Sequence, residues 1–146
     1  SYGAEVTGVT STGNIDLVRS LGADLVIDYT TTDFVENGRR YDLILDTVGN
    51  RSVSDLRRGL AIGGKAAVTG FTSVGKLVAV TLRGGKGIAQ VQARVTAKDL
   101  AILSELILAG KVRPYIERRY PFAEIPSAIA YVEEGHARGK VVASVA

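Results

Sequence analysis

Residues 41–49 read Tyr-Asp-Leu-Ile-Leu-Asp-Thr-Val-Gly, an apolar run that ends in a polar, glycine-containing turn. The consecutive aliphatic side chains of Leu43, Ile44 and Leu45 favour a β-strand that is buried on both faces. Strands of this kind are typical of parallel sheets that carry helices on both sides. The stretch therefore predicts a strand of a helix-covered parallel sheet.

Similar strand-like runs precede and follow this stretch. They lie at residues 5–9, 25–27 and 65–68, and each is followed by hydroxyl, acidic or glycine residues of a turn. The polar stretch 30–40 leaves room for one short helix. The resulting alternation of strands and helices predicts the α/β class, with a doubly wound parallel sheet.

Two of the intervening stretches have the features of helices. Residues 15–21 carry apolar side chains at helical spacing and are followed by Gly22, a residue typical of helix ends. Ser52 is followed three residues later by Asp55, which has the form of a capping box. We expect this second helix to end at Gly63–Gly64.

The pattern is weaker after Gly70. Residues 71–92 have no clean period, and the glycine-rich run 83–87 lacks the Gly-x4-Gly-Lys-Ser/Thr frame of a P-loop. We interpret that run as a flexible loop. Beyond it we expect a strand over 88–95, a helix over 96–110, an extended segment over 112–116, a helix over 125–134 and a strand over 141–145. Pro114 confines the extended segment to the edge of a sheet or leaves it unpaired.

The composition argues against several kinds of site. The 146 residues include no Cys and a single His, His136, so disulfides and thiolate zinc sites are excluded and no metal site is expected. No apolar run reaches the length of a membrane span, so no membrane partner is expected. No signal peptide is visible, and the cytoplasm is the expected location.

The formal charge of +3 is spread over 18 basic and 15 acidic residues. The arginine pairs lie far apart in the sequence, at residues 39–40, 57–58 and 118–119. A nucleic-acid-binding protein concentrates its basic residues on one face, so no nucleic-acid partner is expected. The pairs are interpreted either as solvated surface or as a field for an anionic small molecule.

Polar residues follow the predicted strands. In an open α/β sheet, ligands bind beyond the carboxyl ends of the strands. The hydroxyls, acids, aromatic ring and glycines found there suit a nucleotide, because glycine lets a ligand approach the backbone. Asp46 has two interpretations, an acid–base residue or a structural turn former.

The sequence contains, in this order, the five segments EVTGVTSTGN (5–14), LVRSLGAD (17–24), VIDY (26–29), YDLILDTVG (41–49) and GHARGKVV (135–142). Together they resemble the medium-chain dehydrogenase/reductase superfamily, and within it the zinc-free quinone oxidoreductase-like branch. Each segment alone is weakly specific, whereas the five in the same order are specific.

The resemblance also implies what the sequence lacks. Members of the family begin with a GroES-like catalytic domain, followed by the first strand of the nucleotide-binding fold and a glycine-rich turn for the pyrophosphate. This sequence shows neither, so we expect only the C-terminal portion of such an enzyme. Residues 1–110 would form a partial Rossmann-like domain without its first βα unit, and residues 111–146 would pack on the GroES-like domain.

The resemblance assigns cofactor contacts to the ends of the strands. The turn after the first strand of this chain reads the adenosine ribose, and the aromatic residue after the next strand lines the adenosine-phosphate side. The ends of the following two strands border the cofactor and its nicotinamide. The residues are Thr10, Ser11, Thr12 and Asn14, then Tyr29, then Val48 and Gly49, and then Gly70 and Phe71.

No acid lies at positions 10–14 to pair with the ribose hydroxyls, so NADP(H) is favoured over NAD(H) as the cofactor. No catalytic residue is assigned. His136 lies in the Gly-His-Ala-Arg-Gly-Lys turn, where a surface histidine is favoured over a proton donor.

The resemblance therefore implies the cofactor-binding part of a zinc-independent NADP(H)-dependent oxidoreductase. In the complete enzyme the cofactor would transfer hydride to a small carbonyl, enone or quinone, and a homodimer is compatible with the family. The portion alone is expected to be inactive. The alternative is a non-catalytic nucleotide-binding or interaction module.

Overall fold

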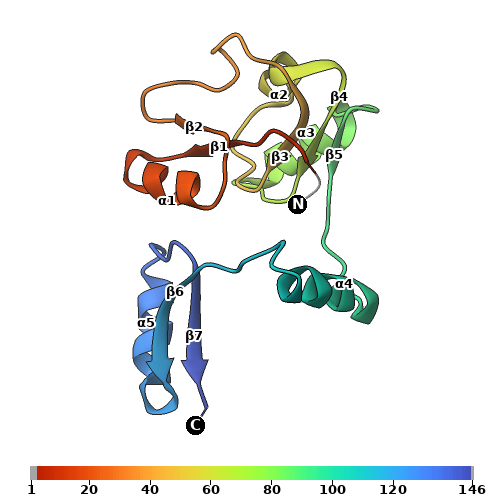
Figure 1. Cartoon of the computed structure of the whole chain (residues 1–146). Helices are drawn as coiled ribbons and strands as arrows, with labels where there is room; N and C mark the ends of the chain where they lie inside the picture. The colour runs from red at the N-terminus through yellow and green to blue at the C-terminus, as the bar shows by residue number, and fades with distance from the viewer. Residues whose placement is uncertain (1–2, 146) are drawn as a thin grey trace. The chain divides into compact units, whose positions relative to one another are not determined.

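The computed structural model describes residues 3–145, which form two compact units (Figure 1). The larger unit spans Glu5–Arg94, and the smaller contains the residues from Val95 onward. Among the described residues, no helix combines the length and apolar character needed to cross a bilayer.

The larger unit alternates strands and helices in the predicted manner. All of its strand pairs are parallel: β1 pairs with β2, and a second sheet has the order β3-β4-β5. The α/β class with parallel sheets is therefore confirmed. The elements are β1 (Thr7–Thr10), the 3-10 helix η1 (Thr12–Asn14), α1 (Ile15–Ser20), β2 (Leu25–Asp28), β3 (Tyr41–Asp46), α2 (Val53–Gly59), β4 (Leu60–Val68), α3 (Val74–Arg83) and β5 (Ile88–Gln90).

The core of this unit joins the β3-β4-β5 sheet to α2 and α3. Leu56 of α2 and Val68 of β4 are the large side chains that are fully buried. Each such side chain stabilises the fold by about 1.5–3 kcal/mol when it leaves water. Ile44, Val53, Ala66, Val80 and Ile88 complete the buried cluster.

Local boundaries differ from the predictions. α2 ends at Gly59, and β4 runs through Gly63–Gly64, where the helix was expected to end. The reason is the ladder with β3, in which Leu60 already pairs with Tyr41. Residues 30–40 form turns and bends and no helix.

α3 was missed because residues 71–92 show no clean period. Its start is marked by the side chain of Ser73, which accepts a hydrogen bond from the backbone N–H of Lys76 at 3.3 Å. The glycine-rich run 83–87 includes the last residue of α3 and the link to β5.

The smaller unit contains α4 (Ala97–Leu108), β6 (Ile116–Pro121), the 3-10 helix η2 (Phe122–Glu124), α5 (Ile125–Glu133) and β7 (Lys140–Ser144). The strands β6 and β7 pair in parallel. Thr96 caps α4 as expected, because its hydroxyl accepts the N–H of Asp99 at 3.1 Å. Pro114 lies outside the ladder, which begins at Ile116, since proline has no N–H to donate. The predicted boundary at residue 110 and the packing of residues 111–146 on a catalytic domain stay predictions.

Candidate functional site

The turn after β1 folds against the end of β2. The hydroxyl of Thr12 donates to Asp28 Oδ2 at 2.6 Å, and it lies 3.1 Å from the hydroxyl of Thr30. Thr30 donates its own hydroxyl and its backbone N–H to Asp28 Oδ1, at 2.7 and 2.9 Å. These residues meet because Thr10 and Asp28, the last residues of β1 and β2, are paired in the ladder.

The Asp28 carboxylate brings negative charge to this turn. Hydrogen bonds from Thr12 and then from Thr30 lower the pKa of Asp28 below its ordinary value, and they outweigh the opposing effect of desolvation. Positions 10–14 contain no acid, so no negative charge was expected at this turn. Asp28 was expected only as a residue at the end of the next strand, and pairing of the two strands brings it to Thr12.

Asn14 lies at the end of the same turn. Its backbone N–H donates to the carbonyl of Ser11 at 2.9 Å, and its side-chain amide donates to the Ser11 hydroxyl at 3.4 Å. Asn14 Oδ1 is buried and has no hydrogen-bond partner among the described residues. An unsatisfied buried acceptor costs about 1–3 kcal/mol, so this oxygen is suited to receive a hydrogen bond from a ligand hydroxyl.

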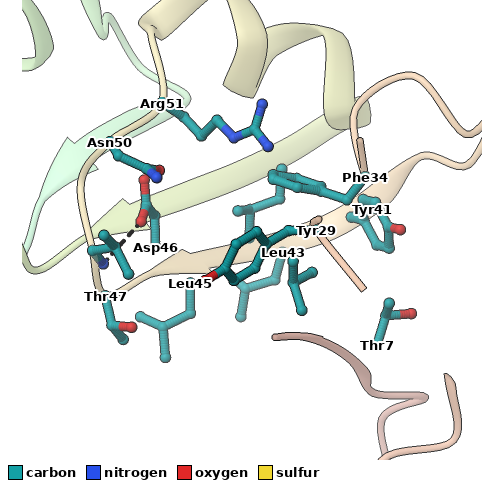
Figure 2. Close-up of a pocket in the computed structure, with 13 residues that line it drawn as sticks. Thr7, Tyr29, Phe34, Tyr41, Leu43, Leu45, Asp46, Thr47, Asn50 and Arg51 are labelled. Atoms are coloured by element: carbon teal, nitrogen blue, oxygen red, sulfur yellow. Dashed lines mark hydrogen bonds between the residues drawn. The ribbon is translucent and has the colours of Figure 1, made fainter. Parts of the chain in front are cut away.

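A cleft of about 390 Å³ separates β1 from β3 (Figure 2). Tyr29, which follows β2, and Val48, which follows β3, both line it. Both side chains are more than half exposed, so they are accessible to a ligand. The structure thus brings together two predicted contacts that are 19 residues apart in the sequence.

Asp46 closes the turn after β3. Its Oδ1 accepts the backbone N–H groups of Val48 at 3.0 Å and Gly49 at 2.8 Å. Its Oδ2 is buried, also without a hydrogen-bond partner in the part of the chain that the structure describes. The geometry supports the interpretation of Asp46 as a turn former.

Gly49 and Gly70 lie together where the loops after β3 and β4 meet. A Cβ added to Gly49 would overlap the carbonyl of Gly70, and one added to Gly70 would overlap the carbonyl of Thr47. Phe71 is half-buried and packs against the core cluster. These three residues therefore have a packing role, and their contact with a cofactor stays a prediction.

Arg51 lines the cleft, although no sequence pattern indicated it as a site residue. Its guanidinium donates to Asp33 at 2.7 Å and lies 5.1 Å from the ring centroid of Phe34. Burial works against ionisation of Asp33, but hydrogen bonds from Arg51 and from the N–H of Val35 outweigh it and lower the pKa of Asp33. No local sequence pattern indicates this ion pair, because Arg51 and Asp33 are 18 residues apart.

Within residues 3–145, no group of three or more His, Cys, Asp or Glu side chains is arranged to hold a metal ion. A family model described as zinc-binding dehydrogenase matches residues 21–142. The chain belongs to the zinc-binding dehydrogenase family.

Two relatives of this chain illustrate the match. The mitochondrial NAD(P)H oxidoreductase RTN4IP1 of Mus musculus is 35% identical over 169 residues, covering 99% of this chain and 43% of the relative. The chloroplastic NADPH-dependent alkenal/one oxidoreductase of Arabidopsis thaliana is 36% identical over 146 residues, covering 97% of this chain and 34% of the relative. The chain therefore spans less than half the length of these relatives.

A solved structure supports the same assignment. The quinone oxidoreductase from Coxiella burnetii superposes with a TM-score of 0.77 and 25% identity, covering 99% of this chain and 46% of that one. The resemblance to medium-chain, quinone oxidoreductase-like enzymes is confirmed. So is the expectation that the chain corresponds to their C-terminal part.

The predicted cytoplasmic location is contradicted. The relatives from Mus musculus and Arabidopsis thaliana are named as mitochondrial and chloroplastic enzymes. The prediction rested on the lack of a visible signal peptide. Because the chain corresponds to less than half of these relatives, that lack carries no information about location.

Proposed function

We propose that this dehydrogenase chain is the cofactor-binding part of a zinc-independent, NADP(H)-dependent oxidoreductase that acts on small carbonyls, enones or quinones. The observation that carries the proposal is the buried, unpartnered Oδ1 of Asn14 at the carboxyl end of β1. This is the turn to which the family resemblance assigns the adenosine ribose. The complete enzyme is proposed to act as a homodimer.

The polar groups at this turn fit the adenosine end of a dinucleotide. A ribose hydroxyl can donate to Asn14 Oδ1, and the hydroxyl of Ser11 can bond a phosphate or ribose oxygen. Tyr29 offers an exposed ring beside the same strand ends. When bound, the cofactor supplies the hydride chemistry, and these residues bind and orient it.

The preference for NADP(H) rests on the turn itself. No acid lies at positions 10–14, and a Cβ at Gly13 would have nothing within 4 Å, so the turn has room for a 2′-phosphate. The Asp28 charge opposes a phosphate, but both of its oxygens already accept hydrogen bonds from Thr12 and Thr30. A relative named as NADPH-dependent is consistent with this preference.

Nuclear magnetic resonance can test the binding proposal on the 146-residue chain. Adenosine 2′,5′-bisphosphate should shift the amide signals of residues 10–14 more strongly, and at lower concentration, than adenosine 5′-monophosphate. The amides of α4, in the other compact unit, serve as the internal control. Equal responses to the two ligands would contradict the NADP(H) preference, and no response in residues 10–14 would contradict the site.

We further propose that the 146 residues alone do not catalyse the reaction, because they span less than half of their enzymatic relatives. Purified chain mixed with NADPH and a quinone or an enone should show no NADPH oxidation above the uncatalysed rate. Turnover would overturn this part of the proposal. The alternative, a non-catalytic module, predicts in addition that the longer protein is inactive although it binds the nucleotide.

A further inference from the structure

Positive charge is concentrated in one part of the chain. Residues 47–94, which contain α2, β4, α3 and β5, carry eight basic residues and a single acid, Asp55. Their net charge is therefore +7, although that of the whole chain is only +3. The carboxylate of Asp55 is already paired with Arg58 at 2.6 Å, so it leaves the other cations of this part uncompensated.

Three of these cations meet at the C-terminal end of α3. The guanidinium of Arg57, on α2, donates a hydrogen bond to the backbone carbonyl of Arg83, the last residue of α3. It also lies 3.9 Å from the position that a Cβ on Gly85 would occupy, next to Lys86 in the sequence. Arg83 and Lys86 are exposed, and their side chains have no hydrogen-bond or ion-pair partner within residues 3–145.

The outward face of α3 is apolar. Val74, Val78 and Leu82 follow one another at intervals of four residues, so they lie on one side of the helix. They are 76%, 46% and 77% exposed, whereas Val80, which points inward, is 4% exposed and belongs to the core. Thr81 lies beside them and donates its hydroxyl at 2.9 Å to the carbonyl four residues earlier in the helix. The outward face is therefore an aliphatic stripe.

A surface helix of a soluble protein ordinarily directs polar residues outward. The aliphatic stripe of α3 departs from this rule, and an apolar surface of this kind marks a contact with a second surface. The cations at the end of α3 require that second surface to be negatively charged. The helix dipole places only about half a negative charge at the same end, so three full positive charges outweigh it.

The residue types on this face distinguish between anionic partners. Surfaces that bind single-stranded nucleic acid combine cations with aromatic rings, whereas residues 47–94 contain one aromatic residue, Phe71, which packs against the core. A second copy of the chain would bring a face of the same positive charge, which opposes association. Protein partners ordinarily insert anchor side chains into pockets, and the cleft described above has no lining residue from α3. An aliphatic stripe beside cations is typical of helices that lie on a lipid surface.

We propose that the aliphatic stripe of α3 and the three cations at its C-terminal end form a docking surface for an anionic membrane. The stripe enters the boundary between lipid headgroups and acyl chains, and the cations contact the lipid phosphates. With ten residues, α3 lies on the membrane and is too short to cross it. The expectation of no membrane partner rested on the length of a spanning segment, which a peripheral contact does not require.

Vesicle binding by the 146-residue chain tests the proposal. At low ionic strength, vesicles of phosphatidylglycerol and phosphatidylcholine in equal parts should bind the chain at least about tenfold more tightly than vesicles of phosphatidylcholine alone. Added salt should weaken this binding, because it screens the cations. Equal binding to the two kinds of vesicle, or binding to neither, would overturn the proposal.

Two double variants locate the charges that matter. Arg83→Glu with Lys86→Glu reverses two cations of the proposed surface, whereas Lys98→Glu with Lys111→Glu makes the same change in net charge at exposed positions of the smaller unit. Each cation near an anionic surface contributes about fivefold to binding, so the first variant should bind at least about 25-fold more weakly and the second should stay within about threefold of wild type. Equal losses in the two variants would show that overall charge alone drives binding, and would overturn the proposal.

An introduced tryptophan tests the apolar part of the contact. The sequence contains no Trp, so one indole reports its surroundings without background. In Val78→Trp, the emission should shift to shorter wavelength when phosphatidylglycerol vesicles are added, because the ring enters the headgroup boundary. Thr31→Trp, in the exposed turn after β2, is the control and should show no shift. An unchanged emission in Val78→Trp would contradict insertion of the stripe.

Two competing occupants have signatures of their own. A second copy of the chain would give a dimer in analytical ultracentrifugation that Leu82→Gln dissociates, without vesicle binding. An acidic protein would be indicated by binding of poly-glutamate that the Arg83→Glu, Lys86→Glu variant loses, again without vesicle binding. Either result would overturn the proposal, whereas anionic vesicle binding that depends on Arg83 and Lys86 supports it.

Discussion

Gly49 and Gly70 lie back to back, so close that a Cβ on Gly49 would overlap the carbonyl of Gly70. The contact joins the loops after β3 and β4, and a hydrogen bond from the Thr72 hydroxyl to the Gly49 carbonyl, at 3.3 Å, supports it. Gly49 also has a φ of +67°, a conformation that side chains with a Cβ rarely adopt. The two glycines are therefore required by the packing of the strand ends, whether or not a ligand is bound.

Gly70→Ala should destabilise the chain by about 1–3 kcal/mol, because its Cβ would meet the backbone of the loop after β3. Gly75→Ala is the matched control. It lies in α3, where the nearest atom to an added Cβ is 3.9 Å away, and it should be neutral or stabilise the helix by about 0.5–1 kcal/mol. Urea unfolding followed by circular dichroism compares the stabilities of the two variants. Equal unfolding midpoints for Gly70→Ala and Gly75→Ala would show that the loops after β3 and β4 can separate without loss of stability.

In the smaller unit, Glu117 of β6 holds the turn that precedes β7. Its carboxylate accepts the Tyr131 hydroxyl at 2.9 Å and the backbone N–H groups of Arg138 and Gly139 at 2.6 and 3.2 Å. Desolvation opposes ionisation, but these hydrogen bonds outweigh it and lower the pKa of Glu117 below its ordinary value of 4.5. The ionised carboxylate therefore favours the folded state.

The sign of the pH effect follows from that lowered pKa. The contribution of Glu117 to stability is fully present above about pH 4.5 and is lost as the pH falls through the lower pKa of the folded state. Glu117→Gln should weaken the pH dependence of the melting temperature below pH 4.5, whereas Glu133→Gln, an exposed change at the end of α5, should leave it unchanged. The same acid dependence in wild type and Glu117→Gln would contradict this assignment.

Gly13→Arg should tighten NADPH binding in a chimera that joins these residues to the N-terminal part of a relative. The position has open space for a side chain, and a guanidinium can pair with a 2′-phosphate. A hydrogen bond to a charged group contributes about 1.5–3 kcal/mol. Fluorescence titration measures both cofactors, and unchanged or weaker NADPH binding, with NADH unaffected, would place the 2′-phosphate elsewhere.

Asp28→Asn tests the charge that the structure brings to the same turn. Removing the carboxylate charge should raise the affinity for NADPH several-fold relative to NADH, because only NADPH carries the 2′-phosphate. Asp16→Asn, an exposed change on α1, is the control and should alter neither affinity. The ratio of the two dissociation constants in the chimera is the readout, and a ratio insensitive to Asp28→Asn would show that the phosphate lies far from this carboxylate.

Local signals were sufficient for much of the fold. The aliphatic run of β3, the capping residues Ser52 and Thr96 and the periodicity of α1 act over a few residues, so they can be read directly from the sequence. The end of α2 could not be read this way, because pairing of Leu60 with β3 prevails over the glycine signal at residues 63–64.

The candidate site also combines features that local sequence determines with contacts that only the tertiary structure creates. The sequence by itself determined the parallel α/β class and the strand ends where polar residues gather, since both follow from residue order and local pattern, and five of its segments resembled the family that the comparisons then showed. Only the tertiary structure brought Asp28 within hydrogen-bonding distance of Thr12 and paired Arg51 with Asp33. It also placed β1 and β3 along one cleft. These contacts join residues many positions apart, and they exist only after strand pairing and burial have brought the segments together.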